Sequence, residues 1–322
     1  MNLKYLFFPL LAVLLSTGLY CSFAYNFSQF GAQGNHFVEV LHLYAEVPDG
    51  SILFVGDSQI REDVDCTVIE DLLKDSPPCF NLGVAGMRPF QVALQKDLII
   101  SARPSKVVIG ITPASFDETI NQNDDFFMLM SSSVTPSSYL LERLDSDELE
   151  LISMNRFQRL LYKRKFILPY FLSFLHRSSS SEAVVPAGNN LKNPHQFEDI
   201  QSAEELEQKL QDPKVLGIFS FGDHPRRERE AFAYLTASLK AEGIEVVVVQ
   251  MPMNPITFNV VPADSLQQYN DYIQGLSEII GFRLVNIETD FSAEYFTDLT
   301  HLNREGSRLL SERIARGEYD VI

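Results

Sequence analysis

Three residues of the types that carry out acyl transfer lie near the two ends of the sequence. Ser58 stands in "VGDSQIRED" (55–63), and Asp298 and His301 stand three residues apart in "YFTDLTHLNREGSRLLSERIA" (295–315). A serine nucleophile needs a base to take its proton, and the base needs an acceptor that fixes its tautomer. An Asp and a His at this spacing can place a carboxylate beside an imidazole. The alternatives are a helix-capping or loop Ser58, a turn-forming Asp298 and a surface His301.

An acyl-transfer site also needs N–H donors directed at the negative oxygen that develops during the reaction. The Ser58 N–H is a candidate because it lies near the expected start of a helix. Gly86, in "NLGVAG" (81–86), is a second candidate. Its alternative role is to allow a backbone conformation that other residues avoid.

The elements that would position these residues alternate between strand and helix. Apolar runs predict strands at 51–55, 79–86 and 106–111, with helices at 65–73 and 89–102 between them. Asp65 is the expected N-cap of the first helix. This order predicts an α/β fold, a doubly wound and mainly parallel sheet that binds ligands at the carboxyl ends of its strands. Ser58 follows the first strand directly.

The alternation is interrupted at 117–213, which we interpret as a helical insertion that includes a Ser-, Gly-, Asn- and Pro-rich loop. It resumes with the apolar stretch 214–221. The later elements are expected to be a helix at 227–243, a strand at 244–252, a helix at 264–280, a strand at 283–288 and a helix from about 303. Residues 36–46 predict a short lead-in helix.

Gly56-Asp57-Ser58, Gly86 after the second strand and Asp298-x-x-His301 together resemble the blocks of the SGNH/GDSL hydrolase superfamily. The resemblance covers roughly 50–116 and 214–315. It implies a flavodoxin-like five-stranded fold, with Ser58 as nucleophile, His301 as base and Asp298 as the residue that orients it. The N–H groups of Ser58 and Gly86 would be the oxyanion donors.

The apolar N-terminus, "NLGVAG", "MPMNP" (251–255) and "TDLTHLN" (297–303) are most similar to the membrane-anchored branch. That branch includes the alginate O-acetylation and D-alanyl-lipoteichoic acid factors. The resemblance implies a serine esterase or O-acyltransferase that acts on glycan or cell-envelope esters through an acyl-serine. Its partners would be an acylated envelope polymer and a membrane-bound acyltransferase, without a cofactor. The alternative is a catalytically weak binding or accessory protein of such a system.

One position departs from the family pattern. The superfamily carries an Asn after the third strand as a further oxyanion donor, whereas Thr112 stands at the aligned place in "GITPAS" (110–115). Thr112 is therefore the third oxyanion candidate. Its side chain is shorter, and Pro113 favours an extended backbone at Thr112. We expect weak hydrolysis from a site with this change.

Composition limits the range of partners. Lys and Arg total 26 against 43 Asp and Glu, which gives a net charge of −17 over 322 residues. A chain this acidic repels phosphate backbones, so we expect no nucleic-acid partner. No His and Cys cluster has the spacing of metal ligands, so no metal site is expected.

The N-terminus has one Lys followed by about twenty mostly apolar residues, a length that can span a bilayer. Residues 1–25 are expected to be a membrane anchor or a signal peptide cleaved near Ser22-Phe23-Ala24. Bulky Tyr20 before Cys21 argues against a lipoprotein. The expected organisation is this segment, a connector at 26–50 and the α/β domain at 51–322, placed outside the cytoplasm in the periplasm or at the cell surface.

Cys66 and Cys79 are expected to be free thiols. Cys66 would begin a helix of about nine residues, roughly 13 Å long, that runs down the sheet, and Cys79 would begin the next strand at the bottom. That separation exceeds the distance of about 7 Å between Cα atoms that a disulfide allows.

Overall fold

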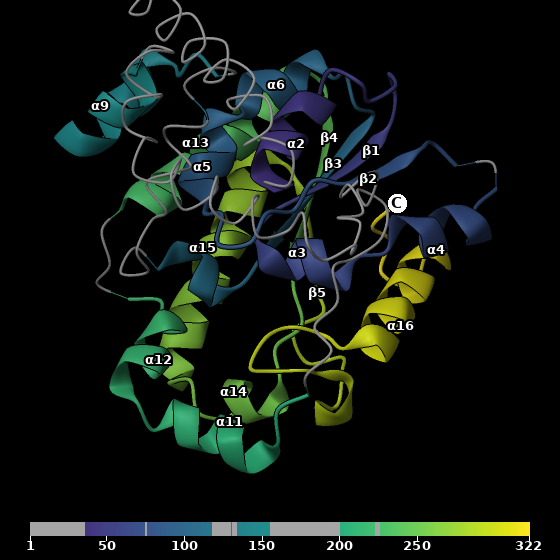
Figure 1. The fold of residues 1–322 in the computed structure, drawn as a ribbon, viewed down its shortest axis with the longest axis vertical. Helices are drawn as coiled ribbons and strands as arrows, with labels where there is room; N and C mark the ends of the chain where they lie inside the picture. The colour runs from purple at the N-terminus through teal and green to yellow at the C-terminus, as the bar shows by residue number, and fades with distance from the viewer. Residues whose placement is uncertain (1–35, 75, 118–129, 131–133, 155–199, 223–225) are drawn as a thin grey trace, which may run out of the picture. The chain divides into compact units, whose positions relative to one another are not determined.

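The computed structural model describes residues 36–322 except 75, 118–129, 131–133, 155–199 and 223–225 (Figure 1). The expected N-terminal anchor or signal segment and much of the expected insertion lie outside the described residues. The chain separates into one unit of Met1–Glu39 and Ser153–Gly188 and another of Val40–Ile152 and Asn189–Ile322. The description below concerns the second unit. Within the described residues, no helix is both long enough and apolar enough to cross a membrane.

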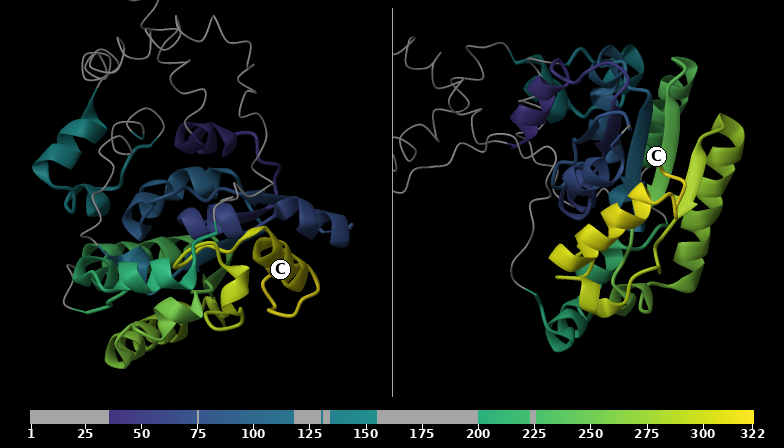
Figure 2. Two further views of the ribbon diagram at one scale, coloured as in Figure 1. Left: turned by 60° about the horizontal axis from the view of Figure 1, so that its bottom comes forward. Right: turned by 90° about the vertical axis from the view of Figure 1, so that its right-hand side faces the viewer.

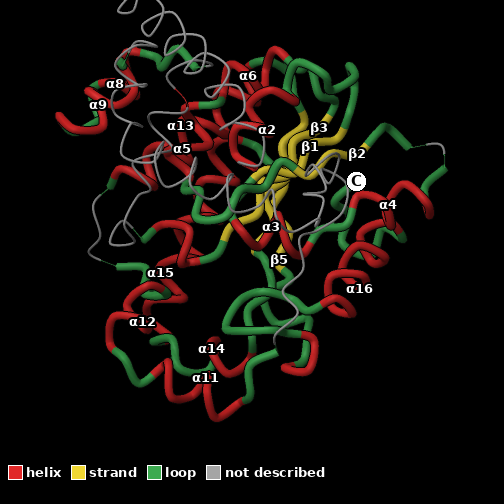
Figure 3. Tube along the Cα trace, viewed as in Figure 1, coloured by secondary structure: helices red, strands yellow, loops and turns green. Residues whose placement is uncertain are grey.

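Five parallel strands form one sheet in the order β2-β1-β3-β4-β5. They are β1 (Ile52–Val55), β2 (Cys79–Asn81), β3 (Lys106–Ile111), β4 (Glu245–Gln250) and β5 (Arg283–Asn286). Figure 3 shows them together as the yellow segments. This is the flavodoxin-like order of a doubly wound sheet. The predicted fold class and sheet are confirmed.

The central strands β3 and β4 are mostly apolar and buried after their charged first residues, as expected for strands covered on both faces. In β3, Val107 to Ile111 are all buried, and the pairing of β3 with β4 extends from Lys106 opposite Glu245 to Ile111 opposite Gln250. β4 contributes four consecutive buried valines at 246–249. The long β3–β4 pair therefore forms the rigid centre of the sheet.

Helices connect the strands and continue through the later part of the chain. They are α2 (His36–Leu43), α3 (Ser58–Asp63), α4 (Cys66–Leu72), α5 (Pro89–Leu94), α6 (Lys96–Ser101), α8 (Ser138–Leu141), α9 (Ser146–Ser153), α11 (Ala203–Leu210), α12 (Pro213–Ile218), α13 (Arg227–Ala241), α14 (Pro255–Phe258), α15 (Ala263–Ile280) and α16 (Arg304–Ala315), with 3-10 turns η1 (Pro113–Phe116) and η2 (Ala293–Tyr295).

The helices form two groups, one for each face of the sheet. Helix α16 contacts both α3 and α4, and α4 and α16 lie side by side (Figure 1). Ile52, Phe54 and Val108 share a buried core with this group. Helices α5, α6 and α15 all contact α13, which also packs on β4; Figure 2 gives two further views. Successive strand residues point to opposite faces, so the buried Leu53 and Val107 face this second group.

Helix α3 lies directly on the ends of the strands because glycines leave room for Ile60. A Cβ on Gly110 would lie 2.4 Å from Ile60 Cδ1, and a Cβ on Gly83 would lie 2.5 Å from the backbone nitrogen of Arg61. Gly83 follows β2 and Gly110 lies in β3, so α3 is pressed against the sheet from both neighbours of β1. Ser58, its first residue, is thereby held at the carboxyl edge.

Two expected elements differ in the structure. The apolar stretch 214–221 is not part of the sheet: its residues 214–218 belong to α12, because Pro213 favours the first helical turn and the Asp212 side chain accepts from Lys214 N at 2.9 Å. Short apolar runs do not distinguish strand from helix by pattern alone. The predicted helix 89–102 is two helices, α5 and α6, which meet at Gln95.

The prediction of free thiols is wrong, since Cys66 and Cys79 form a disulfide with their Cα atoms 5.4 Å apart. The prediction assumed that the helix beginning at Cys66 carries the chain from the carboxyl edge of the sheet back to the start of β2. In the structure α3 makes that descent, and the Asn81 side chain of β2 already donates to Val64 O at 2.7 Å. Cys66, the first residue of α4, therefore already lies beside Cys79 at the start of β2.

Candidate active site

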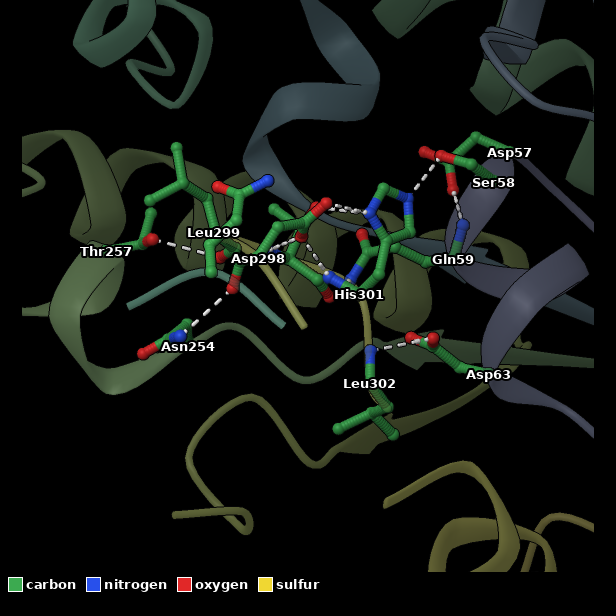
Figure 4. Close-up of polar contacts among 12 residues, drawn as sticks. Asp57, Ser58, Gln59, Asp63, Asn254, Thr257, Asp298, Leu299, His301 and Leu302 are labelled. Carbon is green, nitrogen blue, oxygen red and sulfur yellow. Dashed lines mark hydrogen bonds and ion pairs between the residues drawn. The ribbon is translucent and has the colours of Figure 1, made fainter. Parts of the chain in front are cut away.

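The structure brings Ser58, His301 and Asp298 into one hydrogen-bonded chain (Figure 4). Ser58 Oγ lies 2.8 Å from His301 Nε2 across 243 positions of sequence. His301 Nδ1 lies 2.8 Å from Asp298 Oδ2. The three side chains therefore have the geometry of a nucleophile, a base and an orienting carboxylate.

The turn after β1 places Ser58 at the first position of α3. Asp57 is the N-cap of this helix, and its Oδ1 accepts from Gln59 N at 2.9 Å. Its Oδ2 accepts from the Ser115 hydroxyl at 3.1 Å. Both Asp57 oxygens are thus engaged in holding the turn, which leaves the Ser58 side chain directed at the imidazole.

The loop that carries Asp298 and His301 is a compact turn closed by the same carboxylate. Asp298 Oδ1 accepts from the backbone N–H groups of Thr300 and His301, each at 2.8 Å. Thr297 N donates to His301 O at 2.9 Å across the base of the turn. Asn303 then caps α16 by accepting from Glu305 N and Gly306 N. The spacing of three residues is therefore set by a turn before the helix and not by a helical turn.

Helix α3 is bonded to this loop on both sides of His301. The Gln59 side-chain amide donates to Thr300 O at 3.0 Å and to Pro252 O at 2.8 Å. At the last residue of α3, Asp63 Oδ1 accepts from Leu302 N at 2.9 Å. One rigid helix thus carries Ser58 at its start and fixes the backbone before and after His301.

The segment after β4 supports the loop from a second direction (Figure 4). The Asn254 side chain donates to Asp298 O at 3.0 Å, and the Thr257 hydroxyl donates to Leu299 O at 2.9 Å. Asn254 belongs to "MPMNP". This motif therefore fixes the position of the carboxylate that orients His301.

The electrostatics of the pair favour a carboxylate beside an imidazole that accepts protons readily. Burial opposes the ionisation of Asp298, but the His301 side chain and two backbone N–H groups outweigh it and lower the Asp298 pKa. Burial likewise opposes a charge on His301, but Asp298 outweighs it, with smaller contributions from Asp57 and Glu62, and raises the His301 pKa above its ordinary 6.5. His301 is thus a stronger base than a free imidazole.

Two of the three predicted oxyanion donors are free to act. The backbone N–H groups of Ser58 and Gly86 have no hydrogen-bond partner within the described part of the chain. Gly86 has a φ of 75°, so its alternative role in backbone conformation is also present.

Thr112 is fully buried and extended, with φ −137° and ψ 173°, as the following proline predicts. Its N–H donates to Ser115 Oγ at 3.0 Å, which removes this N–H as a donor. Its hydroxyl oxygen is buried without a partner among the described residues. Thr112 can therefore contribute only through that hydroxyl.

A pocket of about 200 Å³ opens beside Ser58. It is lined by all three predicted oxyanion residues and by one apolar wall, which Ala114, Ile218 and Phe219 form. A pocket this small suits a short acyl group.

Several residues that support or line the site were not predicted, among them Gln59, Asp63 and Arg88. Gln59 and Asp63 carried a signal, since they share a short helix with Ser58, but their bonds to residues 300 and 302 depend on tertiary structure. Arg88 also lines the pocket, two positions after Gly86. Its placement in the pocket had no sequence signal beyond that proximity.

Comparisons with known proteins agree with the resemblance. Residues 189–315, less than half of the 322, match the family model described as DltD protein. The matched residues include Asp298 and His301 but not Ser58. Over these residues the resemblance to the D-alanyl-lipoteichoic acid branch is confirmed. Among curated proteins, none matches the sequence.

Several solved structures are distantly similar to this chain. A catalytic mutant of an acetylxylan esterase from Geobacillus stearothermophilus has a TM-score of 0.40 and 11% identity, covering 84% of this chain and 95% of that one. A lipase/acylhydrolase from Enterococcus faecalis has a TM-score of 0.37 and 12% identity over 85% and 98% of the two chains. A carbohydrate acetylesterase from Sinorhizobium meliloti has a TM-score of 0.34 and 11% identity over 84% and 98%. Likenesses at this level say nothing about the reaction of this chain.

Proposed function

We propose that this chain is an extracytoplasmic serine esterase or O-acyltransferase that acts on glycan or cell-envelope esters through an acyl-Ser58 intermediate. The observation that carries the proposal is the chain of two 2.8 Å contacts from Ser58 Oγ through His301 to Asp298 at the carboxyl edge of the sheet. A serine at a helix start has no structural need for an imidazole and a carboxylate in series.

The reaction follows from this geometry. Ser58 Oγ bonds to the acyl carbon while His301 Nε2 takes its proton, and the carbonyl electron pair moves onto the oxygen. The N–H groups of Ser58 and Gly86 stabilise that oxygen. When the intermediate collapses, the leaving alcohol takes the proton from His301. Water or an acceptor hydroxyl then repeats the sequence in reverse.

The location outside the cytoplasm is supported by the Cys66–Cys79 disulfide, since such bonds persist mainly in oxidising compartments. The apolar residues 1–25 would anchor the chain or direct its export. Protease treatment of spheroplasts tests this proposal. Digestion of the domain without lysis supports it, and protection until lysis contradicts it.

The likeness of residues 189–315 to DltD supports an envelope polymer as substrate and a membrane-bound acyltransferase as partner. Hydrolysis and transfer are separated by adding a glycan or polyol acceptor to a reaction with an aryl acetate. Transfer is indicated when the acylated acceptor accumulates while water is present in excess.

Labelling with a serine-reactive phosphonate tests the catalytic role. We expect the wild type to be labelled at Ser58 and to cleave an aryl acetate, and Ser58→Ala to lose both while its folding is unchanged. Ser292→Ala is the matched control, because Ser292 is exposed and makes no side-chain cap bond. A folded wild type that is never labelled and cleaves no ester would favour the binding or accessory protein instead.

A further inference from the structure

Arg88 places a permanent positive charge in the pocket beside Ser58. Its side chain lines the same 200 Å³ pocket as Ser58, Gly86 and Thr112, and the residue is only 6% exposed. Of the described residues that line this pocket, it alone carries a permanent positive charge. A guanidinium stays protonated at any working pH.

The Arg88 guanidinium has no carboxylate partner in the part of the chain that the structure describes. One terminal nitrogen donates to the Ala114 carbonyl, and within the described residues no Asp or Glu lies at ion-pair distance from it. A guanidinium has five N–H donors, and those not directed at Ala114 remain available. A buried charge without a partner is costly, which points to an anion that completes the site at some stage.

The surroundings of His301 are otherwise acidic. The carboxylates of Asp298, Asp57 and Glu62 all act on the imidazole and raise its pKa. The same carboxylates oppose any second negative charge that forms at Ser58 during the reaction. The oxyanion therefore needs a compensating cation more than it would in a neutral site.

We propose that Arg88 stabilises the oxyanion of the tetrahedral intermediate and so compensates for the amide side chain that Thr112 replaces. This inference rests on the proposed acyl-Ser58 reaction. As Ser58 Oγ adds to the acyl carbon and its proton passes to His301 Nε2, the negative charge collects on the former carbonyl oxygen. That oxygen lies among the N–H donors of Ser58 and Gly86, in the pocket that Arg88 lines.

The size of the pocket supports an effect of this kind. The pocket holds only about 200 Å³, and Arg88 and Ser58 both line it, so a charge that forms at Ser58 lies near Arg88 in a partly enclosed space where charges interact strongly. We expect a contribution of about tenfold to a hundredfold in kcat.

The experiment compares Arg88→Gln, Arg88→Lys and Arg304→Gln with the full-length wild type. Substrates are neutral p-nitrophenyl acetate and the anionic mono-p-nitrophenyl ester of succinate. Arg304, exposed at the start of α16, is the control for loss of one positive charge near the catalytic loop. Thermal unfolding establishes that each variant is folded.

We expect Arg88→Gln to lower kcat on the neutral ester about tenfold to a hundredfold with KM changed less than about threefold. Arg88→Lys keeps the charge and should retain most of the rate, and Arg304→Gln should match the wild type. The acidic limb of the pH profile of Arg88→Gln should move to higher pH, because a cation that disfavours imidazolium is gone. A purely structural role would not move it.

Three results would overturn the inference. An unchanged kcat of folded Arg88→Gln on the acetate excludes an effect on the oxyanion. A loss confined to KM for the succinate ester assigns Arg88 to substrate recognition instead. A folded Arg88→Lys whose kcat on the acetate is tenfold or more below that of the wild type shows that the charge is not the cause. Because this comparison is with the wild type, it remains decisive when Arg88→Gln fails to fold. If wild-type Ser58 is not labelled, the proposed function fails as well; if it is labelled, any of these three results overturns the Arg88 inference alone.

Discussion

Asp298→Asn tests whether the carboxylate sets the tautomer and basicity of His301. Asp298 Oδ1 accepts from Thr300 N and His301 N, and an Asn oxygen can keep both bonds, so the turn should fold unchanged. The other oxygen, 2.8 Å from His301 Nδ1, becomes an NH₂ group. The imidazole must then accept at Nδ1 and carry its proton on Nε2, where it can no longer take the Ser58 proton.

The size of the loss follows from this change of tautomer. In a serine protease the equivalent substitution lowers kcat about 10⁴-fold, and we expect about 10³–10⁴-fold here at neutral pH. The pH profile should shift as well. Asp298 raises the His301 pKa above 6.5, so wild-type kcat/KM should be lost as pH falls through a midpoint above 6.5. Without the carboxylate, burial dominates, so the midpoint of any residual activity should move to lower pH than in the wild type.

The assay is aryl acetate hydrolysis between pH 5 and 9, with the rate of phosphonate labelling as a second readout. Asp290→Asn, the same chemical change at an exposed residue of the preceding loop, is the control and should leave both unchanged. Activity of Asp298→Asn within about threefold of wild type, with an unmoved midpoint, would refute the assignment of Asp298 as the orienting residue.

Three further predictions concern other parts of the structure. Thr112→Asn should raise kcat/KM on a small activated ester about tenfold, because it exchanges an unpartnered hydroxyl for the amide donor of the family; no gain in steady-state assays would show that this position is not aligned with the family Asn. Gly83→Ala should destabilise by about 1–3 kcal/mol in urea unfolding and lower kcat, because its Cβ would lie 2.5 Å from Arg61 N and displace α3, whereas Gly275→Ala, with open space at its Cβ, should be neutral or stabilising. Glu288 is 2% exposed and burial raises its pKa from 4.5 to about 7, so its contribution to stability is fully present below pH 4.5 and is lost as pH rises through about 7. The wild type should lose about 2–4 kcal/mol of unfolding free energy across that pH range, and Glu288→Gln should not. Plots of Tm against pH from 4.5 to 8 that stay parallel for the two proteins would contradict this reasoning.

The sheet could be predicted because each strand is a local apolar run. β3 begins and ends where the sequence predicts it, at Lys106 and Ile111, and β4 and β5 lie within their predicted ranges. The differences lie in short segments, whose pattern does not distinguish a helix from a strand. The stretch 214–221 became α12 through a local cap and a proline, and α3 was too short to show a helical period.

The same short helix accounts for the failed prediction on the cysteines. A chain that leaves β1, descends in α3 and reaches Val64 lies beside Asn81, the last residue of β2, and Cys66 follows only two residues later. The disulfide then follows from the distance between Cα atoms, 5.4 Å, and not from the number of residues between the cysteines. The prediction failed because it considered only the length of the helix that Cys66 begins and left out the descent of the chain in α3.

Helix α3 also explains why Ser58, Asp298 and His301 could be proposed as a site from sequence while the residues that support them could not. The side chains that we propose to react must be of fixed types, so candidates for them can be found in the sequence. Their supports, Gln59 and Asp63, need only reach backbone groups of the loop, and other polar side chains could do the same. Because α3 binds the loop at Thr300 and at Leu302, a displacement of α3 moves the nucleophile and the base together. The distance from Ser58 Oγ to His301 Nε2 is therefore protected by the helix, and changes that loosen α3 from the sheet should affect stability before they separate the two atoms.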